Sequence, residues 1–448
     1  MKNTLHLPLA GILATGILAA IQTTTAAPPG GGRGAKILQE FTLPPFSMAN
    51  FGYTAAELAA AEVNGAVTDL PALGSGLQQL NGNQYLSITD RGPTFDRSAP
   101  PGSKAFPLPQ FNPIIVISQA AGGQIIPLSY LPLINDNGDP ITGLPNGPLD
   151  DAPGYLTVTT PVGNPLPFNQ DALDTEDIHT LPGGGFILVE EYGPSVVIVS
   201  ATGNVLKRYT PGGKTWPLAN YSVSDRLPSV LTHRRANRGL EGIAVSPDGR
   251  TAYTVMQSPL GSTATGTLTR DSLLVRIIRM DISNPLDMKV TGQFVSYLRP
   301  VAEYPAGNFP RDLKISAAAW VSDDRLLILE RTDKTGAGGS NLGGAKLILV
   351  DLTNATDVTD HPDAGSSLVL EKVTTNLALL EPPIDPATSQ VILDVNAELP
   401  AITDFKLEGL AILNANTVSI SNDNDFGIGD VPGRSSKLWQ IRLGTQLR

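Results

Sequence analysis

Acidic side chains recur in two places of a short pattern that occurs five times along the chain. The pattern is an apolar run, a tight polar turn and a second apolar run with a polar end, and its copies are 75–92, 176–193, 241–259, 317–333 and 408–425. The copies begin with Ser75, Glu176, Glu241, Ala317 and Glu408. Their second runs end at Asp90, Glu191, Gln257, Glu330 and Asn422. Carboxylate and amide oxygens are the ligands that Ca²⁺ prefers.

Carboxylates that lie close together need a neutralising partner, because like charges raise one another's pKa. With two further acids from the last copy, the predicted calcium ligands are Asp90, Glu176, Glu191, Glu241, Glu330, Glu408, Asp423 and Asp425. Three of them are also the predicted catalytic residues, as metal ligands or as groups that orient water: Glu176, Glu241 and Glu408. The alternative is that single carboxylates cap turns or pair with arginines of a neighbouring copy.

Basic residues stand next to several of the acidic positions. Arg91 and Arg331 each follow a second run, and "THRRANRGLEG" (232–242) sets His233 and Arg238 before Glu241. Guanidinium groups bind phosphate and carboxylate oxygens through paired hydrogen bonds. We therefore predict that Arg91, Arg238, Arg331 and His233 bind substrate oxygens. A solvated basic loop that pairs with the acidic positions is the alternative.

Other chemistries have less support in the sequence. The chain has no cysteine, which excludes thiolate metal sites and a cysteine nucleophile, and it has no GxSxG element of the serine-hydrolase type. The segment "DNDFGIGD" (423–430) lacks the twelve-residue length and terminal Glu of an EF-hand. His179 follows the acidic pair Glu176–Asp177 and fits either a central channel or a packed interior.

The elements that must position these residues are β-hairpins. The five turns are rich in Gly, Asn and Asp, which accept the backbone angles of tight hairpin turns. Further strand-like runs follow three of the copies, and two hairpins in succession make a four-stranded antiparallel sheet. Repeated units of this kind predict an all-β protein, a β-propeller of five or six blades with loop insertions. A pair of β-sandwich domains is the alternative, but it does not explain the shared pattern.

In a propeller, the first strand of a blade begins on the same face on which the second strand ends. The two acidic positions would therefore surround one mouth of the central channel. We expect residues 35–44 to add an outer strand to the last blade, beside 436–444, and a sixth blade could occupy 360–400. The best helix candidate is 54–63.

Composition and the N-terminus predict an exported protein. Residues 1–27 read as a secretory signal, 28–35 as a flexible leader and 36–448 as a single propeller domain. No later run is long and apolar enough to predict a membrane span. The net charge of −11 argues against a nucleic-acid partner and suits cation binding. We expect a secreted or periplasmic monomer that acts on a small-molecule ester.

Four segments resemble the phytase-like family, described as the esterase-like activity of phytase. They are "LSITDRGPTFD" (86–96), the run from 174 to 209 that begins "DTEDIHTLPGGG", "NRGLEGIAVSPDGRTAYTVMQSPL" (237–260) and "FKLEGLAILNANTVSISNDNDFG" (405–427). The resemblance spans most of the chain. It implies an exported β-propeller with calcium at its rim and hydrolysis of phosphate or other esters.

Two other functions fit the same residues. A non-catalytic propeller would use the mouth to bind a ligand or partner, with calcium serving only the structure. A lactonase-like metal propeller would need carboxylate and amide ligands but no arginines.

Overall fold

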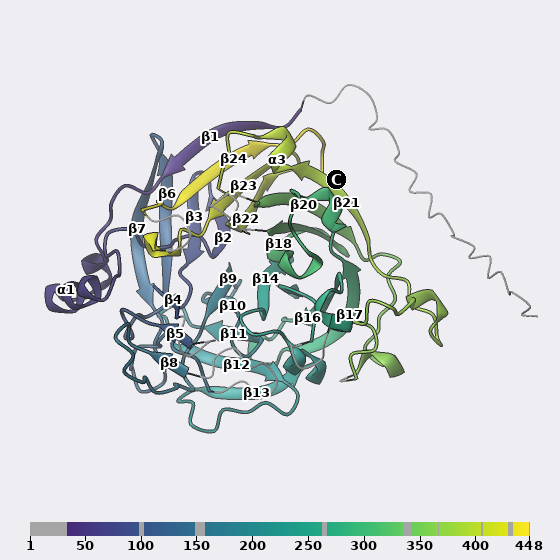
Figure 1. The fold of residues 1–448 in the computed structure, drawn as a ribbon, viewed down its shortest axis with the longest axis horizontal. Helices are drawn as coiled ribbons and strands as arrows, with labels where there is room; N and C mark the ends of the chain where they lie inside the picture. The colour runs from purple at the N-terminus through teal and green to yellow at the C-terminus, as the bar shows by residue number, and fades with distance from the viewer. Residues whose placement is uncertain are drawn as a thin grey trace, which may run out of the picture. The chain divides into compact units, whose positions relative to one another are not determined.

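The computed structural model describes residues 34–97, 103–147, 157–261, 267–332, 334, 342–365, 367–404, 406–428 and 433–447. From Gly34 onward the chain forms one compact unit, and that unit is built almost entirely of strands (Figure 1). The predicted signal, 1–27, and most of the predicted leader, 28–35, lie outside the described residues.

The strands form five antiparallel groups of four, which we number in chain order of their first strands. Group 1 contains β2 (Gly76–Asn81), β3 (Gln84–Ile88), β6 (Ile114–Ala121) and β7 (Gln124–Pro132). Group 2 contains β9 (Thr175–Thr180), β10 (Phe186–Glu190), β11 (Ser195–Val199) and β12 (Val205–Pro211), with β13 (Ser222–Leu227) added in parallel. Group 3 contains β14 (Leu240–Val245), β15 (Thr251–Met256), β16 (Leu274–Asp281) and β17 (Lys289–Tyr297).

The last two groups follow the same order. Group 4 contains β18 (Lys314–Ser322), β19 (Arg325–Thr332), β20 (Gly344–Asp351) and β21 (Thr388–Asp394). Group 5 contains β22 (Leu407–Asn414), β23 (Thr417–Asn422), β24 (Lys437–Arg442) and β1 (Lys36–Thr42). A small separate sheet contains β4 (Phe95–Arg97), β5 (Ser103–Ala105) and β8 (Thr157–Thr159).

The first strands of the five groups form a closed ring of contacts. β2 contacts β9, β9 contacts β14, β14 contacts β18, β18 contacts β22, and β22 contacts β2, and these strands surround the centre of the view in Figure 1. Groups 1 and 5 share one sheet only through a single parallel pair, Thr42 with Gln124. The predicted all-β, propeller-like arrangement is confirmed in this form.

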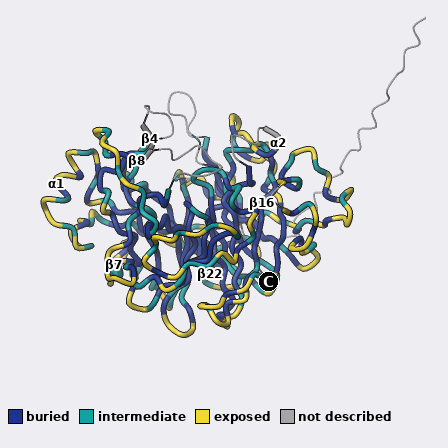
Figure 2. Tube along the Cα trace, turned by 90° about the horizontal axis from the view of Figure 1, so that it is seen from below, coloured by how far each residue is buried: buried dark blue, intermediate teal, exposed yellow. Residues whose placement is uncertain are grey.

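The core lies between adjacent groups, because strands covered on both faces bury long runs of Val, Ile and Leu. Val189 and Ile198 of group 2 pack with Leu240 and Ile278 of group 3, for example. Figure 2 shows the buried residues gathered at the middle of the unit, with exposed residues in the connecting loops.

The predicted closing strand is confirmed. β1 runs antiparallel to β24 from Lys36 opposite Arg442 to Thr42 opposite Lys437. The indole N–H of Trp439 donates to Glu40 Oε2 at 2.9 Å, and Lys437 Nζ lies 2.7 Å from Glu40 Oε1. A strand from the start of the unit thus completes the sheet at its end.

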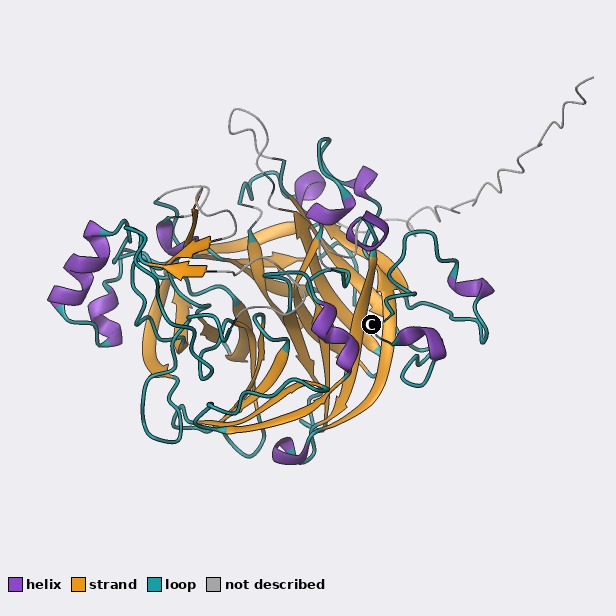
Figure 3. Ribbon diagram, turned by 60° about the horizontal axis from the view of Figure 1, so that its bottom comes forward, coloured by secondary structure: helices purple, strands orange, loops and turns teal. Residues whose placement is uncertain are grey.

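The helices lie outside the sheets (Figure 3). The predicted helix is α1 (Ala55–Val63), and its capping box is formed by Thr54 and Glu57. The other two are single turns, α2 (Thr267–Arg270) and α3 (Val395–Glu398). The described part of 360–387 carries short 3-10 turns, Pro362–Ala364 and Leu377–Leu379, before β21. The structure describes no helix that is long and apolar enough to cross a membrane.

Candidate functional site

The first strands of groups 2 to 5 each contain a β-bulge near their start. In β9, Asp177 lies opposite Val189 and Thr175 opposite Glu190, so Glu176 is the extra residue. The same irregularity occurs in β14, β18 and β22, where the extra residues are Glu241, Ser316 and Glu408. A bulge re-aims the side chain that it adds. The bulge residue of group 4 is therefore Ser316. The comparison of the five repeat copies had placed Ala317 at the equivalent position.

Residues at equivalent positions near the end of each second strand form a second set. Opposite the first strands, Ile88, Val189, Val255, Leu329 and Ser421 occupy equivalent pairs. Two residues further on stand Asp90, Glu191, Gln257, Arg331 and Asp423. The alignment had Glu330 and Asn422 in groups 4 and 5, so it was wrong by one residue in both.

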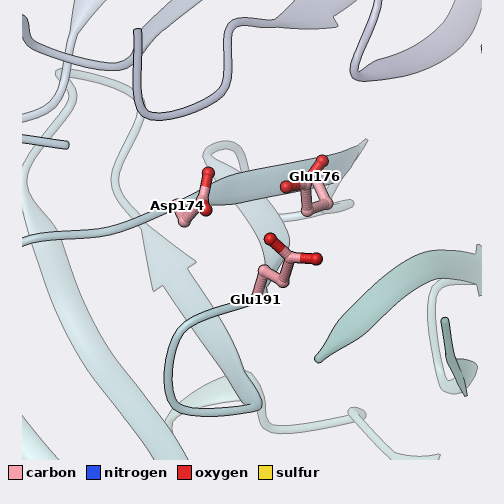
Figure 4. Close-up of side chains that lie close together, drawn as sticks. All are labelled: Asp174, Glu176 and Glu191. Atoms are coloured by element: carbon pink, nitrogen blue, oxygen red, sulfur yellow. The ribbon is translucent and has the colours of Figure 1, made fainter. Parts of the chain in front are cut away.

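Three carboxylates of group 2 lie close enough together to share one cation. Oxygen atoms of Asp174, Glu176 and Glu191 all lie within 4.8 Å of one another, and all three residues are buried. Asp174 and Glu176 come from the start of β9, and Glu191 from just after β10, so the hairpin brings them to the same end (Figure 4). Burial raises the pKa of Asp174 and Glu176 well above the usual range, and the neighbouring carboxylates raise it further.

Glu241 of group 3 joins this cluster. It is 1% exposed, and its Oε2 has no hydrogen-bond partner in the described chain. Burial raises its pKa well above the usual range, and Glu191 and Glu408 add to the rise. The Gln257 amide donates to Glu191 Oε1 at 3.0 Å, while its own carbonyl oxygen has no described partner. Buried oxygens without donors are costly unless a cation or bound water reaches them.

Arg91 is the cation nearest to this cluster. Its Nη1 forms ion pairs with Asp174 and, at 3.4 Å, with Glu191, and it donates to Asn237 Oδ1 at 2.5 Å. The Arg91 guanidinium thus pairs with two carboxylates. The Glu176 side chain, by contrast, has no hydrogen bond to any described residue.

Cations from groups 4 and 5 neutralise the opposite part of the site. Arg331 is buried, donates to Ser316 Oγ at 2.5 Å and forms an ion pair with Glu408. Burial nevertheless raises the pKa of Glu408 to about 8. Lys406 forms ion pairs with Asp423 and Asp425, and these contacts hold the pKa of Asp423 below its usual value against the effect of burial.

Asp90 connects the two parts. It is half-buried, and its Oδ1 accepts from the Gly92 N–H at 2.8 Å. Burial and the nearby Asp423 raise its pKa to about 7. We call the set Asp90, Asp174, Glu176, Glu191, Glu241, Glu408 and Asp423 the acidic mouth.

The other predicted site residues lie apart from these contacts. The Glu330 carboxylate accepts from Arg299 N at 2.8 Å and Tyr304 Oη at 2.9 Å, between groups 3 and 4. Arg238 donates to Ser258 Oγ at 2.8 Å and stands beside Gly239, which packs on the Glu191 backbone. His233 ends a 3-10 helix, Ser229–His233, before this loop.

Two residues of the site escaped the sequence reasoning. Asp174 precedes its repeat copy by two positions, and Lys406 precedes Glu408 by two. Both are charged residues that stand just before a copy that begins with Glu. Extending every copy by two residues toward the N-terminus would have included them.

The donor set fits a hard divalent cation. Asp174, Glu176, Glu191 and Glu241 offer carboxylate oxygens only, with no sulfur and no imidazole, and Glu241 keeps a buried oxygen without a donor. Three cations, Arg91, Arg331 and Lys406, face the seven carboxylates of the acidic mouth. The arrangement can therefore accept further positive charge.

Comparison with known proteins gives a family match and several distant similarities. An uncharacterized secreted protein from Arthroderma benhamiae is 26% identical over 301 residues, 61% of this chain and 58% of that protein. The alignment therefore spans under two thirds of that relative's length.

Two solved structures are similar at a much lower level. The aldose sugar dehydrogenase of Streptomyces coelicolor, in its PQQ-bound form, is 12% identical, with 93% of this chain and 100% of that chain covered and a TM-score of 0.35. A glycosyl hydrolase from Bacteroides ovatus is 7% identical, with 84% and 86% covered and a TM-score of 0.36.

The family comparison covers most of the chain, including all five repeat copies up to Phe426. Residues 68–426 match the phytase-like family model, esterase-like activity of phytase. The resemblance seen in the four sequence segments is thereby confirmed, and the chain belongs to the phytase-like family.

Proposed function

We propose that the protein is an exported, five-bladed β-propeller that binds Ca²⁺ at its acidic mouth and hydrolyses an ester there. The closed ring of five first strands supports the blade number. Export is supported by the secreted relative, by the signal-like residues 1–27 and by the lack of a membrane-spanning helix among the described residues.

The buried Glu241 Oε2 without a hydrogen-bond donor is the observation that carries the calcium site. It stands beside the cluster of Asp174, Glu176 and Glu191, in which repulsion and burial both raise pKa values. These four residues would hold the ion. Bound Ca²⁺ supplies charge neutralisation and a more acidic coordinated water.

The side chains around that site have distinct parts in the proposed hydrolysis. Glu176, which has no hydrogen bond to another described side chain, can hold and orient the attacking water. Arg91 lies against the cluster and can bind an oxygen of the ester, and Arg238 flanks it on the Gly239 loop. Fixed guanidinium groups favour the extra negative charge that develops during attack on the ester.

One observation favours the non-catalytic alternative. Arg331 is already paired with Glu408, and Arg91 with Asp174 and Glu191. If these pairs persist when a ligand arrives, the mouth binds a cation and a partner without turning over an ester.

Calcium titration of the purified protein, followed by calorimetry and thermal unfolding, tests the site. We expect Ca²⁺ to raise the melting temperature, and Glu241→Gln to weaken calcium affinity by about tenfold or more, because a buried carboxylate loses its charge. Asp360→Asn, at an exposed carboxylate outside the mouth, is the matched control and should leave affinity unchanged. Unchanged affinity in Glu241→Gln would eliminate this calcium site.

Ester hydrolysis is measured separately on p-nitrophenyl phosphate, p-nitrophenyl acetate and phytate, with calcium and with chelator. Turnover that requires calcium and falls in Glu176→Gln supports the enzyme. Calcium stabilisation without turnover of any of these esters would leave the ligand-binding alternative.

A further inference from the structure

Asp177 closes the central axis below the acidic mouth. Its Oδ2 accepts from Ile243 N at 2.9 Å and its Oδ1 from Ile178 N at 2.8 Å. The backbone N–H groups of Leu77 and Ala318 also bind this carboxylate. These donors come from β2, β9, β14 and β18, so one side chain ties four of the five first strands together.

A cavity of about 480 Å³ opens beyond Asp177. It is lined by later residues of all five first strands, among them Gln78, His179, Ser246, Trp320 and Ile412. The acidic mouth lies at the start of these strands, so the cavity opens toward the opposite face. Its volume is within the range of about 300–1,000 Å³ that is usual for small-molecule sites.

The wall of this cavity has few ionisable groups. Asp177 and His179 are the only ionisable residues among the described residues that line it. The Asp177 carboxylate is already bound by backbone N–H groups from four strands. His179 Nδ1 lies 2.8 Å from the Thr180 carbonyl, and burial lowers the pKa of its imidazole, which favours the neutral ring. An ion entering this space would find no opposite charge to replace its hydration.

The wall is nevertheless rich in hydrogen-bonding groups. Each first strand pairs with its second strand only, so the backbone edge that faces the axis has donors and acceptors left over. The Gln78 amide is held in place by the N–H and hydroxyl of Thr180, at 2.9 and 3.1 Å. Trp320 is half-exposed and lines the wall, and its ring also packs against Tyr253, with the ring centroids 5.7 Å apart.

We propose that this cavity is a second binding site, for a neutral polyhydroxylated molecule of about monosaccharide to disaccharide size. Hydroxyl groups both donate and accept, which suits the mixed backbone edges. The C–H face of a sugar ring packs on an aromatic ring, here that of Trp320. Asp177 separates this site from the acidic mouth, so it functions without the calcium site.

Calorimetric titration of the full-length protein with glucose, maltose and myo-inositol tests the proposal. We expect at least one of these probes to bind with a dissociation constant in the range of ~1 mM or below. Glucose 6-phosphate and gluconate, which carry charge, should bind at least about tenfold more weakly. Removing calcium with chelator should not change the affinity, which separates this proposal from the calcium site.

Variants of the wall locate the binding. Trp320→Leu and Gln78→Leu should each weaken binding about tenfold, and Tyr297→Leu, at an exposed aromatic outside the cavity, should not. Ala319→Leu narrows the cavity without removing a hydrogen bond, and should weaken binding even if Trp320→Leu fails to fold. No binding of any neutral probe at ~20 mM, equal binding of the charged probes, or affinity unchanged in all wall variants would overturn the proposal.

Discussion

The buried carboxylates at the strand ends near the mouth differ in the donors that reach them. Glu190 accepts from Ser195 Oγ and Arg208 Nη2, both at 2.8 Å, and Glu330 accepts from Tyr304 Oη and Arg299 N. Glu191 and Glu241, which belong to the acidic mouth, depend on shared or missing donors. Glu330 Oε2, like Glu241 Oε2, is buried without a hydrogen-bond donor in the described chain. The two residues differ in their neighbours, because Glu330 is held by Tyr304 and Arg299, whereas Glu241 stands beside other carboxylates of the acidic mouth.

Glu330 gives a pH prediction that is separate from the calcium site. Burial raises its pKa to about 7 in the folded protein, against 4.5 for an ordinary glutamate. The protonated form is therefore favoured in the fold, and its stabilisation is present below about pH 4.5 and lost as pH rises through about 7. Relative to Glu330→Gln, the wild-type free energy of unfolding should fall by up to about 3 kcal/mol between pH 5 and 8.

Denaturant unfolding of both proteins across this pH range measures the difference. Asp323→Asn, in the exposed turn of the same hairpin, is the control and should show no such trend. A wild-type-minus-variant difference that stays constant with pH would show that Glu330 does not titrate in this range.

The sequence predicted most of the site residues but not their register. Aligning the copies on their turns assumes that every copy has the same number of residues between the turn and the strand end. A β-bulge or a longer strand changes that number. For this reason Ala317, Glu330 and Asn422 were placed where Ser316, Arg331 and Asp423 stand. Glu330 and Glu241 are both buried and differ in their neighbours, Tyr304 and Arg299 around one and Glu191 near the other, which no single copy contains together.

At the scale of the strand, glycines occupy an equivalent position near the start of three first strands. Gly76, Gly242 and Gly409 lie where first strands of neighbouring groups meet. A Cβ on Gly242 would lie 2.5 Å from Ala318 N and 2.7 Å from the Ala317 carbonyl carbon. Backbone atoms of β18 cannot yield as a flexible side chain can, so Gly at this position sets how closely two strands approach.

Gly242→Ala should lower the free energy of unfolding by about 2 kcal/mol or more, because the added methyl group separates β14 from β18. Chemical denaturation measures the loss. Gly183→Ala is the matched control, since Gly183 has no atom within 4 Å of an added Cβ and no positive φ, and its effect should stay within about 0.5 kcal/mol. Equal effects of the two variants would contradict a steric limit at the axis.

At the scale of the whole unit, the sequence identified hairpins, helix 54–63 and the closing strand, because each has a local pattern. It left the number of blades open, because residues 367–373 resemble a strand in sequence. In the structure those residues do not form a strand. Those residues precede 3-10 turns, and Glu371 forms a buried ion pair with Arg276 of group 3. Which apolar run joins a sheet is decided by its neighbours in space.

Deleting residues 1–42 should destabilise the unit, because β24 loses one of its two partner strands and the buried Phe41 is removed. We expect a lower melting temperature and faster hydrogen exchange at the β24 amides that face β1, because the amides that face β23 keep their partner strand. Deleting residues 1–33 alone is the control and should leave exchange in β24 unchanged. Protection of β24 in the longer deletion would show that β1 does not close the last group.

The repeated bulge also bears on how the charge of the mouth can change. The extra residue of each first strand lies outside the regular pairing, and in this one chain the position is occupied by Glu176, Glu241, Ser316 and Glu408. Substituting the residue at a bulge position breaks no hydrogen bond between the paired strands. The glycines and apolar residues beside it remain constrained by packing. A substitution at one of these positions would therefore change the charge of the mouth in that blade while the strand pairing persists.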